Sequence, residues 1–66
     1  MSASVLITEL KGRMNEAGYN QKSLAKAADL NETYVRDILK GKSKNPEASR
    51  LAKIALALGC TVDDLY

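Results

Sequence analysis

Residues 21–41, QKSLAKAADLNETYVRDILKG, form two short stretches of helical periodicity separated by about three residues. Asn20 precedes the first stretch and Asn31 precedes the second, and asparagine is among the best N-cap residues. At both places an apolar residue comes just before the asparagine and another lies four residues after it, which is the pattern of a hydrophobic staple. The sequence therefore predicts helices at about residues 21–28 and 32–40, with a sharp angle between them.

Helical periodicity also precedes this pair. Leu6, Leu10 and Met14 lie on one stripe, so we expect a helix that starts at the N-cap Ser4 and ends at Gly18. No segment alternates in hydrophobicity with a period of two over five or more residues, so the sequence predicts no strand.

The chain after the pair predicts two more helices. Asn45 and Pro46 suit the N-cap and first position of a fourth helix, which ends at Gly59. Thr61 starts a fifth, with two aspartates in its first turn. The expected fold is all-α, with five short helices in one domain over residues 1–66.

The composition limits what such a domain can do. The 66 residues include ten Lys and Arg, eight Asp and Glu, no His and one Cys, for a net charge of +2. Without His, the commonest general base and metal ligand are missing, and Cys60 alone builds neither a disulfide nor a cysteine-type zinc site. We therefore expect no enzymatic activity, no metal or other cofactor and no small-molecule ligand, and we expect Cys60 to pack in the core.

Targeting signals are also missing from the sequence. The longest uncharged apolar-rich stretch has nine residues, too few to cross a membrane, and the first residues have no basic segment of the kind that starts a secretion signal. For a protein encoded by a bacterium or a phage, the expected location is the bacterial cytoplasm, at the nucleoid, with no membrane partner.

The second helix of the pair separates polar from apolar side chains. At about 100° per residue, one arc of about 140° holds the polar residues, and the apolar ones occupy the opposite arc. Arg36 suits two hydrogen bonds to guanine, and Thr33 suits contact with a thymine methyl. Glu32 and Asp37 suit the amine of cytosine. A solvated face with a Glu32–Arg36 ion pair explains the same pattern, so both interpretations stay open.

Positive charge is concentrated on the same helices. Residues 22–44 carry a net charge of +3, whereas the residues before them are neutral and residues 45–66 carry −1. Lys40, Lys42 and Lys44 lie where a helix inserted into a DNA groove would meet phosphates. This coincidence favours a DNA-binding surface over a solvated face.

The segment Gln21-Lys-Ser-Leu24-Ala25-x-x-Ala28-x-Leu30-Asn31-x-x-Tyr34-Val35-x-x-Ile38-x-x-Gly41 closely resembles the helix-turn-helix of lambda-repressor-like (Cro/CI, or XRE-type) DNA-binding domains. The later segments Leu51-Ala52-x-Ile54-Ala-x-Ala57-Leu58-Gly59 and Val62-Asp-Asp-Leu65 match the last two helices of that family. The resemblance covers about Leu6 to Leu65. It implies a helix-turn-helix at about 21–40, in which the third helix of the domain, Glu32–Lys40, enters the major groove. Domains of this family usually bind as a homodimer on a two-fold operator.

The resemblance also implies roles for individual residues. The positions that contact bases are Asn31, Glu32, Thr33, Arg36 and Asp37. The positions that contact the DNA backbone are Asn20, Gln21, Tyr34, Lys40, Lys42, Lys44 and Asn45. The three asparagines are also explained as helix caps, and Tyr34 as a half-buried core residue, so these alternatives remain. The usual dimer surface lies around Cys60 to Tyr66, where Leu65 and Tyr66 would be apolar contacts; a fraying end of the chain is the alternative.

The sequence departs from the family in three places. Asp29 stands at the turn position where glycine is usual, and aspartate tolerates the left-handed conformation better than most residues. Met14 and Leu39 stand where many members have a buried Arg–Glu pair, so we expect an apolar contact there. Two acids on the base-contacting face, Glu32 and Asp37, predict weak non-specific binding and a more exacting choice of site.

The function that these features favour is a sequence-specific regulator of transcription, most often a repressor that blocks a promoter. The chain is expected either to be a minimal regulator or to be the N-terminal part of a longer phage-repressor-type protein. The alternative is an antitoxin or another protein-interaction module on the same fold.

Overall fold

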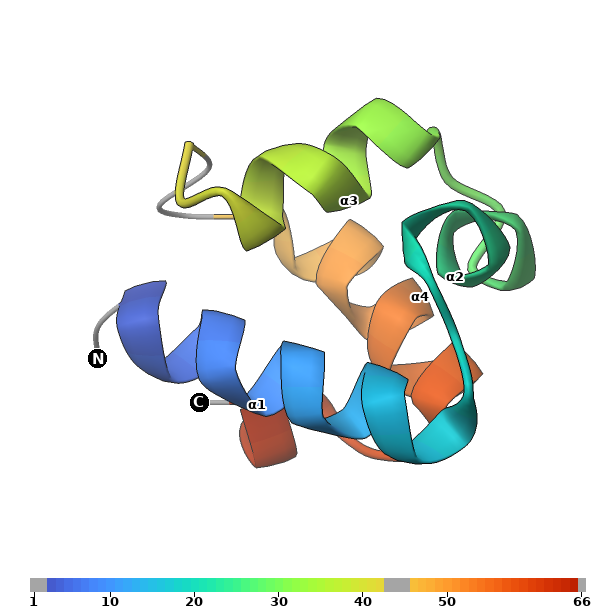
Figure 1. Cartoon of the computed structure of the whole chain (residues 1–66). Helices are drawn as coiled ribbons and strands as arrows, with labels where there is room; N and C mark the ends of the chain where they lie inside the picture. The colour runs from blue at the N-terminus through green and yellow to red at the C-terminus, as the bar shows by residue number, and fades with distance from the viewer. Residues whose placement is uncertain (1–2, 43–45, 66) are drawn as a thin grey trace.

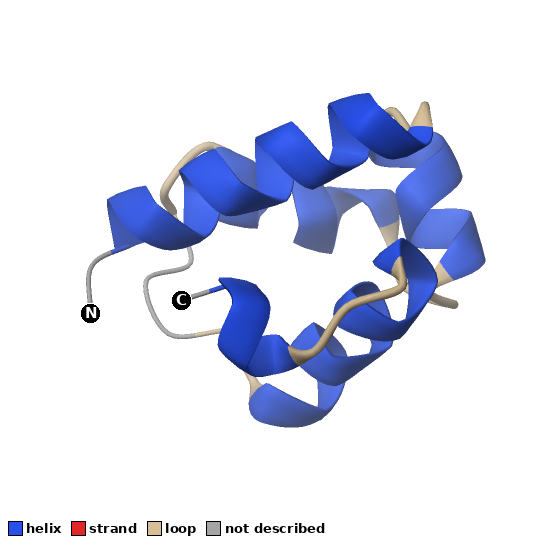
Figure 2. Ribbon diagram, turned by 90° about the horizontal axis from the view of Figure 1, so that it is seen from below, coloured by secondary structure: helices blue, strands red, loops and turns tan. Residues whose placement is uncertain are grey.

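The computed structural model describes residues 3–42 and 46–65. Four α-helices, α1 (Ala3–Ala17), α2 (Gln21–Ala27), α3 (Glu32–Leu39) and α4 (Ala48–Leu58), are followed by one 3₁₀ turn, η1 (Val62–Leu65). In Figure 1, α1 and α3 lie on opposite sides of the molecule, α2 closes one end, and α4 runs behind them. The described residues contain helices and loops only, as Figure 2 also shows, so the expected all-α fold is confirmed.

The core is apolar throughout and receives side chains from every element. Its centre contains no buried polar or charged side chain among the described residues. α2 packs against α3 and α4, and η1 packs against α1 and α4, so the five elements share one interior. The buried residues are Leu6, Leu10, Met14, Leu24, Ala25, Ala28, Val35, Ile38, Leu51, Ile54, Ala55 and Leu65.

The caps expected at the starts of α2 and α3 are present. The side chain of Asn20 accepts a hydrogen bond from the backbone N–H of Ser23 at 2.8 Å, and the Ser23 hydroxyl accepts one from the N–H of Asn20 at 2.9 Å. Asn31 accepts a bond from the N–H of Thr33 at 2.8 Å. Ser4 is not the cap of α1, because the helix already begins at Ala3, a residue of high helix propensity.

All four helices end in the same way. At each end the residue after a left-handed position donates its N–H to the carbonyl five residues back, at 2.8–2.9 Å, which is the Schellman motif. The left-handed position is Gly18, Gly41 and Gly59 for α1, α3 and α4, with φ of 73–78°. For α2 it is Asp29, at φ 57°.

The expected start of the fourth helix is wrong. α4 begins at Ala48 with Glu47 as its N-cap, so Asn45 does not cap it and Pro46 is not its first residue. Asn45 itself lies outside the described residues. The backbone of Glu47 is extended, at φ −61° and ψ 133°, and its N–H donates a hydrogen bond to the Tyr34 hydroxyl at 3.2 Å. This contact with α3 gives the N–H of Glu47 a partner outside the helix.

The expected fifth α-helix is a single 3₁₀ turn. Thr61 and Asp64 bond each other reciprocally, N–H to side-chain oxygen, at 3.0 and 3.3 Å. The bonds from Thr61, first from its backbone and then from its side chain, lower the pKa of Asp64 below its ordinary value of 3.8. Leu65 is fully buried, so it is not the exposed dimer contact that the sequence suggested, and Tyr66 lies outside the described residues.

Candidate nucleic-acid interface

The α2–α3 pair has the geometry of a helix-turn-helix. Ala28 caps the end of α2, and Asn31 already caps the start of α3. Between them, Leu30 donates its N–H to the carbonyl of Ala25 at 2.8 Å and packs against the core. This bond fixes the direction of the chain as it leaves α2, so the angle between the helices is set by the turn and not only by packing.

The two faces of α3 differ sharply. Val35 and Ile38 are fully buried, while Tyr34 and Leu39 are half-buried against the core. On the other face Glu32, Thr33 and Arg36 are exposed with Lys40, and Asp37 is half-buried. With eight residues, α3 is about 12 Å long, so this outer face is a short, continuous polar surface.

Arg36 is not paired with Glu32. The ion pairs among the described residues are Glu9 with Arg13 and Glu47 with Arg50, each at 3.8 Å. The interpretation of the polar arc as a face held by a Glu32–Arg36 pair is therefore not supported, and the guanidinium of Arg36 keeps its donors for another partner.

The cap residues keep their own donors as well. Asn20 and Asn31 use the amide oxygen to accept from the backbone, which leaves the NH₂ group of each side chain pointing away from that bond. Both residues are exposed. Capping and contact with nucleic acid are thus compatible at these positions.

A groove of about 600 Å³ lies between α1, the start of α2 and α3. Gln21 is half-buried in its wall, next to Asn20 and Glu32. Two lysines that the motif comparison did not single out, Lys11 and Lys22, line the same groove. The structure thus extends the polar surface of α3 toward α1. Lys11 lies on α1, outside the helix-turn-helix pattern, and the pattern gives no role to Lys22 on α2.

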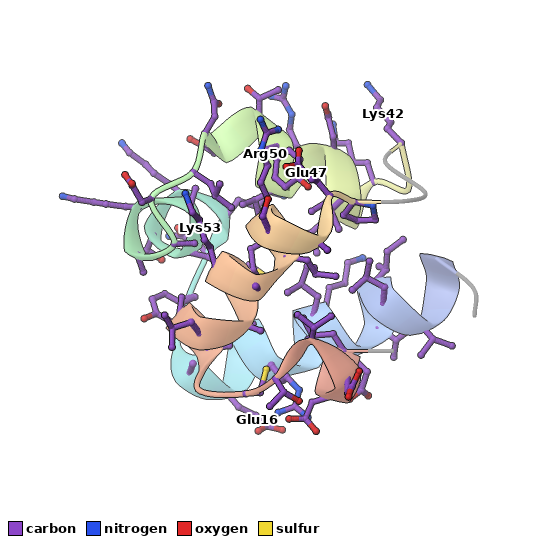
Figure 3. The ribbon with its side chains drawn as sticks, turned by 180° about the vertical axis from the view of Figure 1, so that it is seen from behind. Glu16, Lys42, Glu47, Arg50 and Lys53 are labelled. Atoms are coloured by element: carbon purple, nitrogen blue, oxygen red, sulfur yellow. The ribbon has the colours of Figure 1, made fainter. Side chains whose placement is uncertain are left out.

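The opposite side of α3 faces α4. The Arg50 guanidinium lies over the Tyr34 ring, 5.1 Å from its centroid, and Arg50 and Lys53 line a smaller groove with Asn31 and Tyr34. In Figure 3, Arg50 and Lys53 extend from α4 toward α3 and the turn before it, and Lys42 lies beyond the other end of α3. Residues 45–66 carry a net charge of −1, but two cations of this segment, Arg50 and Lys53, lie beside α3.

The remaining basic positions are only partly described. Lys40 and Lys42 are exposed at the end of α3, and their contact with the DNA backbone stays a prediction. Lys44 and Asn45 lie outside the described residues.

Comparison with known families gives one decisive match. The family model of the Cro/C1-type helix-turn-helix DNA-binding domain matches residues 9–66. The chain belongs to this family. A comparison with curated proteins finds no match. As a Cro/C1-type domain, the chain binds double-stranded DNA and acts as a DNA-binding regulator.

The structure explains two departures of this Cro/C1-type domain from the usual pattern. Asp29 adopts the left-handed conformation of the glycine that it replaces. Met14 is buried, Leu39 is half-buried against the core, and both line the groove between α1 and α3. Both positions are apolar, which spares the domain the desolvation of two charges, and the direct contact between Met14 and Leu39 stays a prediction.

Two further observations concern the described residues of the Cro/C1-type domain. No group of three or more metal-binding side chains comes together in residues 3–42 and 46–65. No helix in this part of the chain is long and apolar enough to cross a membrane.

Proposed function

We propose that this protein is a sequence-specific transcriptional regulator, acting as one domain over residues 1–66, that places α3 in the major groove and represses by occupying a promoter. The observation that carries the proposal is the outer face of α3. Glu32, Thr33 and Arg36 are exposed there and form no ion pair with another described residue, while the inner face anchors the helix in the core. An α-helix with its side chains is about 10–12 Å in diameter, which fits the width of the B-DNA major groove, about 12 Å.

Each polar side chain of that face suits a particular base edge. Arg36 is the strongest candidate, because a free guanidinium donates two hydrogen bonds to guanine. Thr33 suits the thymine methyl group, and the free NH₂ group of Asn31 suits donation to the N7 of adenine. Glu32 and Asp37 suit the amine of cytosine.

The phosphates are contacted from both sides of α3 in this proposal. Asn20 and Gln21 lie on the α1 side, and Tyr34, Lys40 and Lys42 lie toward the α4 side and the end of the helix. Lys44 and Asn45 complete this set as predictions from the family pattern. The side chains on the two sides would contact opposite strands of one groove.

The two acids on the outer face make the choice of site more exacting. Glu32 and Asp37 repel phosphates wherever no cytosine amine is available to them, so binding to random DNA is weak. Similar affinities for the selected site and for random duplex at about 150 mM salt would contradict this part of the proposal.

Selection of bound duplexes from a random pool tests the proposal directly. We expect enrichment of a defined site, and we expect Arg36→Ala to lose preference at one base pair while still binding DNA, at a cost of about 1–3 kcal/mol for the preferred site. Arg13→Ala is the matched control, since it removes an arginine from α1 that belongs to a Glu9 ion pair. Failure of the wild-type chain to enrich any site would refute the specific regulator.

We also propose that two copies bind one operator. Leu56 is 81% exposed on α4, two residues before the helix ends, and it replaces Leu65 as the candidate apolar contact. One leucine covers little area, so the dimer is expected to form on DNA and to dissociate in solution. The selected site should be two-fold symmetric, and Leu56→Glu should weaken binding to the full site but not to a half-site. Equal loss on both duplexes would refute this contact.

A further inference from the structure

A cluster on the α4 side of α3 joins two helices through one tyrosine. The Tyr34 hydroxyl accepts a hydrogen bond from the N–H of Glu47 at 3.2 Å, and the Arg50 guanidinium lies over the Tyr34 ring at 5.1 Å. Arg50 also approaches the Glu47 carboxylate at 3.8 Å. Arg50 is therefore held from two directions beside α3.

The cluster leaves donors unused. The Arg50 side chain is 51% exposed, and its contact to Glu47 is made through Nε alone, which leaves the outer edge of the guanidinium open. The Tyr34 hydroxyl accepts from Glu47, so its own proton remains to be donated. Lys53 lines the same groove and is exposed.

The position of these donors matters once α3 is in a groove. A helix in the major groove has a phosphate strand on each side. Arg50 and Lys53 lie on the flank of α3 that faces away from the α1 groove, and Lys42 lies beyond the end of the helix (Figure 3). Two carboxylates face the same cations, Glu47 at 3.8 Å from Arg50 and Asp29 in the wall of the groove. They lower the local positive charge without occupying the outer edge of the guanidinium.

We propose that Arg50, oriented by the Tyr34 ring, binds a DNA phosphate on the α4 side of α3, with Lys53 extending the same contact surface. The inference rests on the proposed function, since it requires α3 in the groove. It adds a residue of α4 to the DNA interface and gives Tyr34 a second role, as the platform that fixes the direction of Arg50.

The salt dependence of binding separates this role from a purely structural one. We expect Arg50→Ala to lower affinity for the selected and for random duplex by similar factors, and to reduce the slope of log affinity against log salt by about one. The loss should consequently be about threefold larger at 50 mM salt than at 200 mM. Arg50→Lys should retain the slope, and Glu47→Gln should raise affinity because it frees the guanidinium from its carboxylate.

Arg13→Ala is again the matched control, because Arg13 has the same 3.8 Å ion-pair distance to a glutamate of its own helix. It shares a shallow pocket with Glu16, which lies at the far end of the molecule from Arg50 in Figure 3. Its removal should leave the salt slope unchanged.

Two results would overturn the inference. One leaves the proposed function standing, and the other overturns the proposed function as well. An unchanged slope for Arg50→Ala, with Arg36→Ala still losing its base preference, would leave the proposed function intact and make Arg50 a structural residue. Absence of any duplex binding by the wild-type chain would remove both. Thermal unfolding of Arg50→Ala should be recorded alongside, because partial unfolding lowers the apparent affinity without altering the slope.

Discussion

Replacement of Asp29 by glycine should stabilise the domain. Asp29 has φ 57° at a helix end where the other three helices have glycine at φ 73–78°. A side chain in the left-handed region costs up to about 1–2 kcal/mol, less for aspartate than for most residues. Glycine removes that cost but loses about 0.5–1 kcal/mol through the greater freedom of the unfolded chain. The Asp29 carboxylate also faces the negative end of the α2 dipole, at a cost of about 0.3 kcal/mol when exposed.

These contributions add to a net gain of about 0.5–1 kcal/mol for Asp29→Gly. In a domain of this size that raises the Tm by about 2–8 °C. Asp29→Asn should give the smaller gain from charge removal alone, because asparagine keeps the tolerance for positive φ. Asp29→Ala should be less stable than the wild type, since alanine bears the full cost of the left-handed conformation.

Thermal and urea unfolding of the four proteins measure this order directly. The expected stability is Gly above Asn, Asn above Asp, and Asp above Ala. A glycine variant no more stable than the alanine variant would refute the argument, because it would mean that the conformation of residue 29 contributes nothing. DNA binding offers a second check, since removal of this carboxylate from the groove that holds Arg50 should slightly raise affinity for random duplex.

Three other predictions follow from the core and the helix contacts. Met14→Ala should lower the free energy of unfolding by about 2–3 kcal/mol. In a double-mutant cycle with Leu39→Ala, the two losses in unfolding free energy should not be additive; additivity within about 0.5 kcal/mol would show that the two residues do not touch. Tyr34→Phe should lower the free energy of unfolding in urea by about 0.5–1.5 kcal/mol, because the backbone N–H of Glu47 loses its partner. An unchanged free energy of unfolding would mean that this hydrogen bond does not stabilise the fold. Asp64→Asn should be less stable than the wild type at neutral pH. Because the folded pKa of Asp64 is lowered, its contribution is present above 3.8 and lost as the pH falls further, so the difference in Tm should narrow below pH 3.8; a constant difference would contradict the assignment.

The sequence predicted the helix-turn-helix well because its signals are local. The caps at Asn20 and Asn31 need only the next three residues, and the left-handed ends need only glycine or its closest substitute. The buried faces of α1, α3 and α4 follow from helical periodicity alone. These features agree with the structure to within one or two residues.

The failures concern contacts between distant segments. The start of α4 differs from the expectation where the N–H of Glu47 bonds a tyrosine thirteen residues earlier. Arg50 joins the α3 side through a ring on another helix, which no spacing within α4 reveals. Leu65 is buried because η1 packs back onto α1 and α4. Its burial is therefore set by the tertiary fold and not by its nearness to the end of the given sequence.

The independence of the outer face of α3 has an evolutionary consequence. Among the described residues, no hydrogen bond or ion pair ties the side chain of Glu32, Thr33 or Arg36 to the rest of the domain. Under the proposed function, substitutions there alter what the protein recognises and leave the scaffold about as stable as before. New operator preferences would then arise one residue at a time, through intermediates that all fold. Substitutions on the inner face of the same helix would instead destabilise the domain, because its side chains are packed in the core.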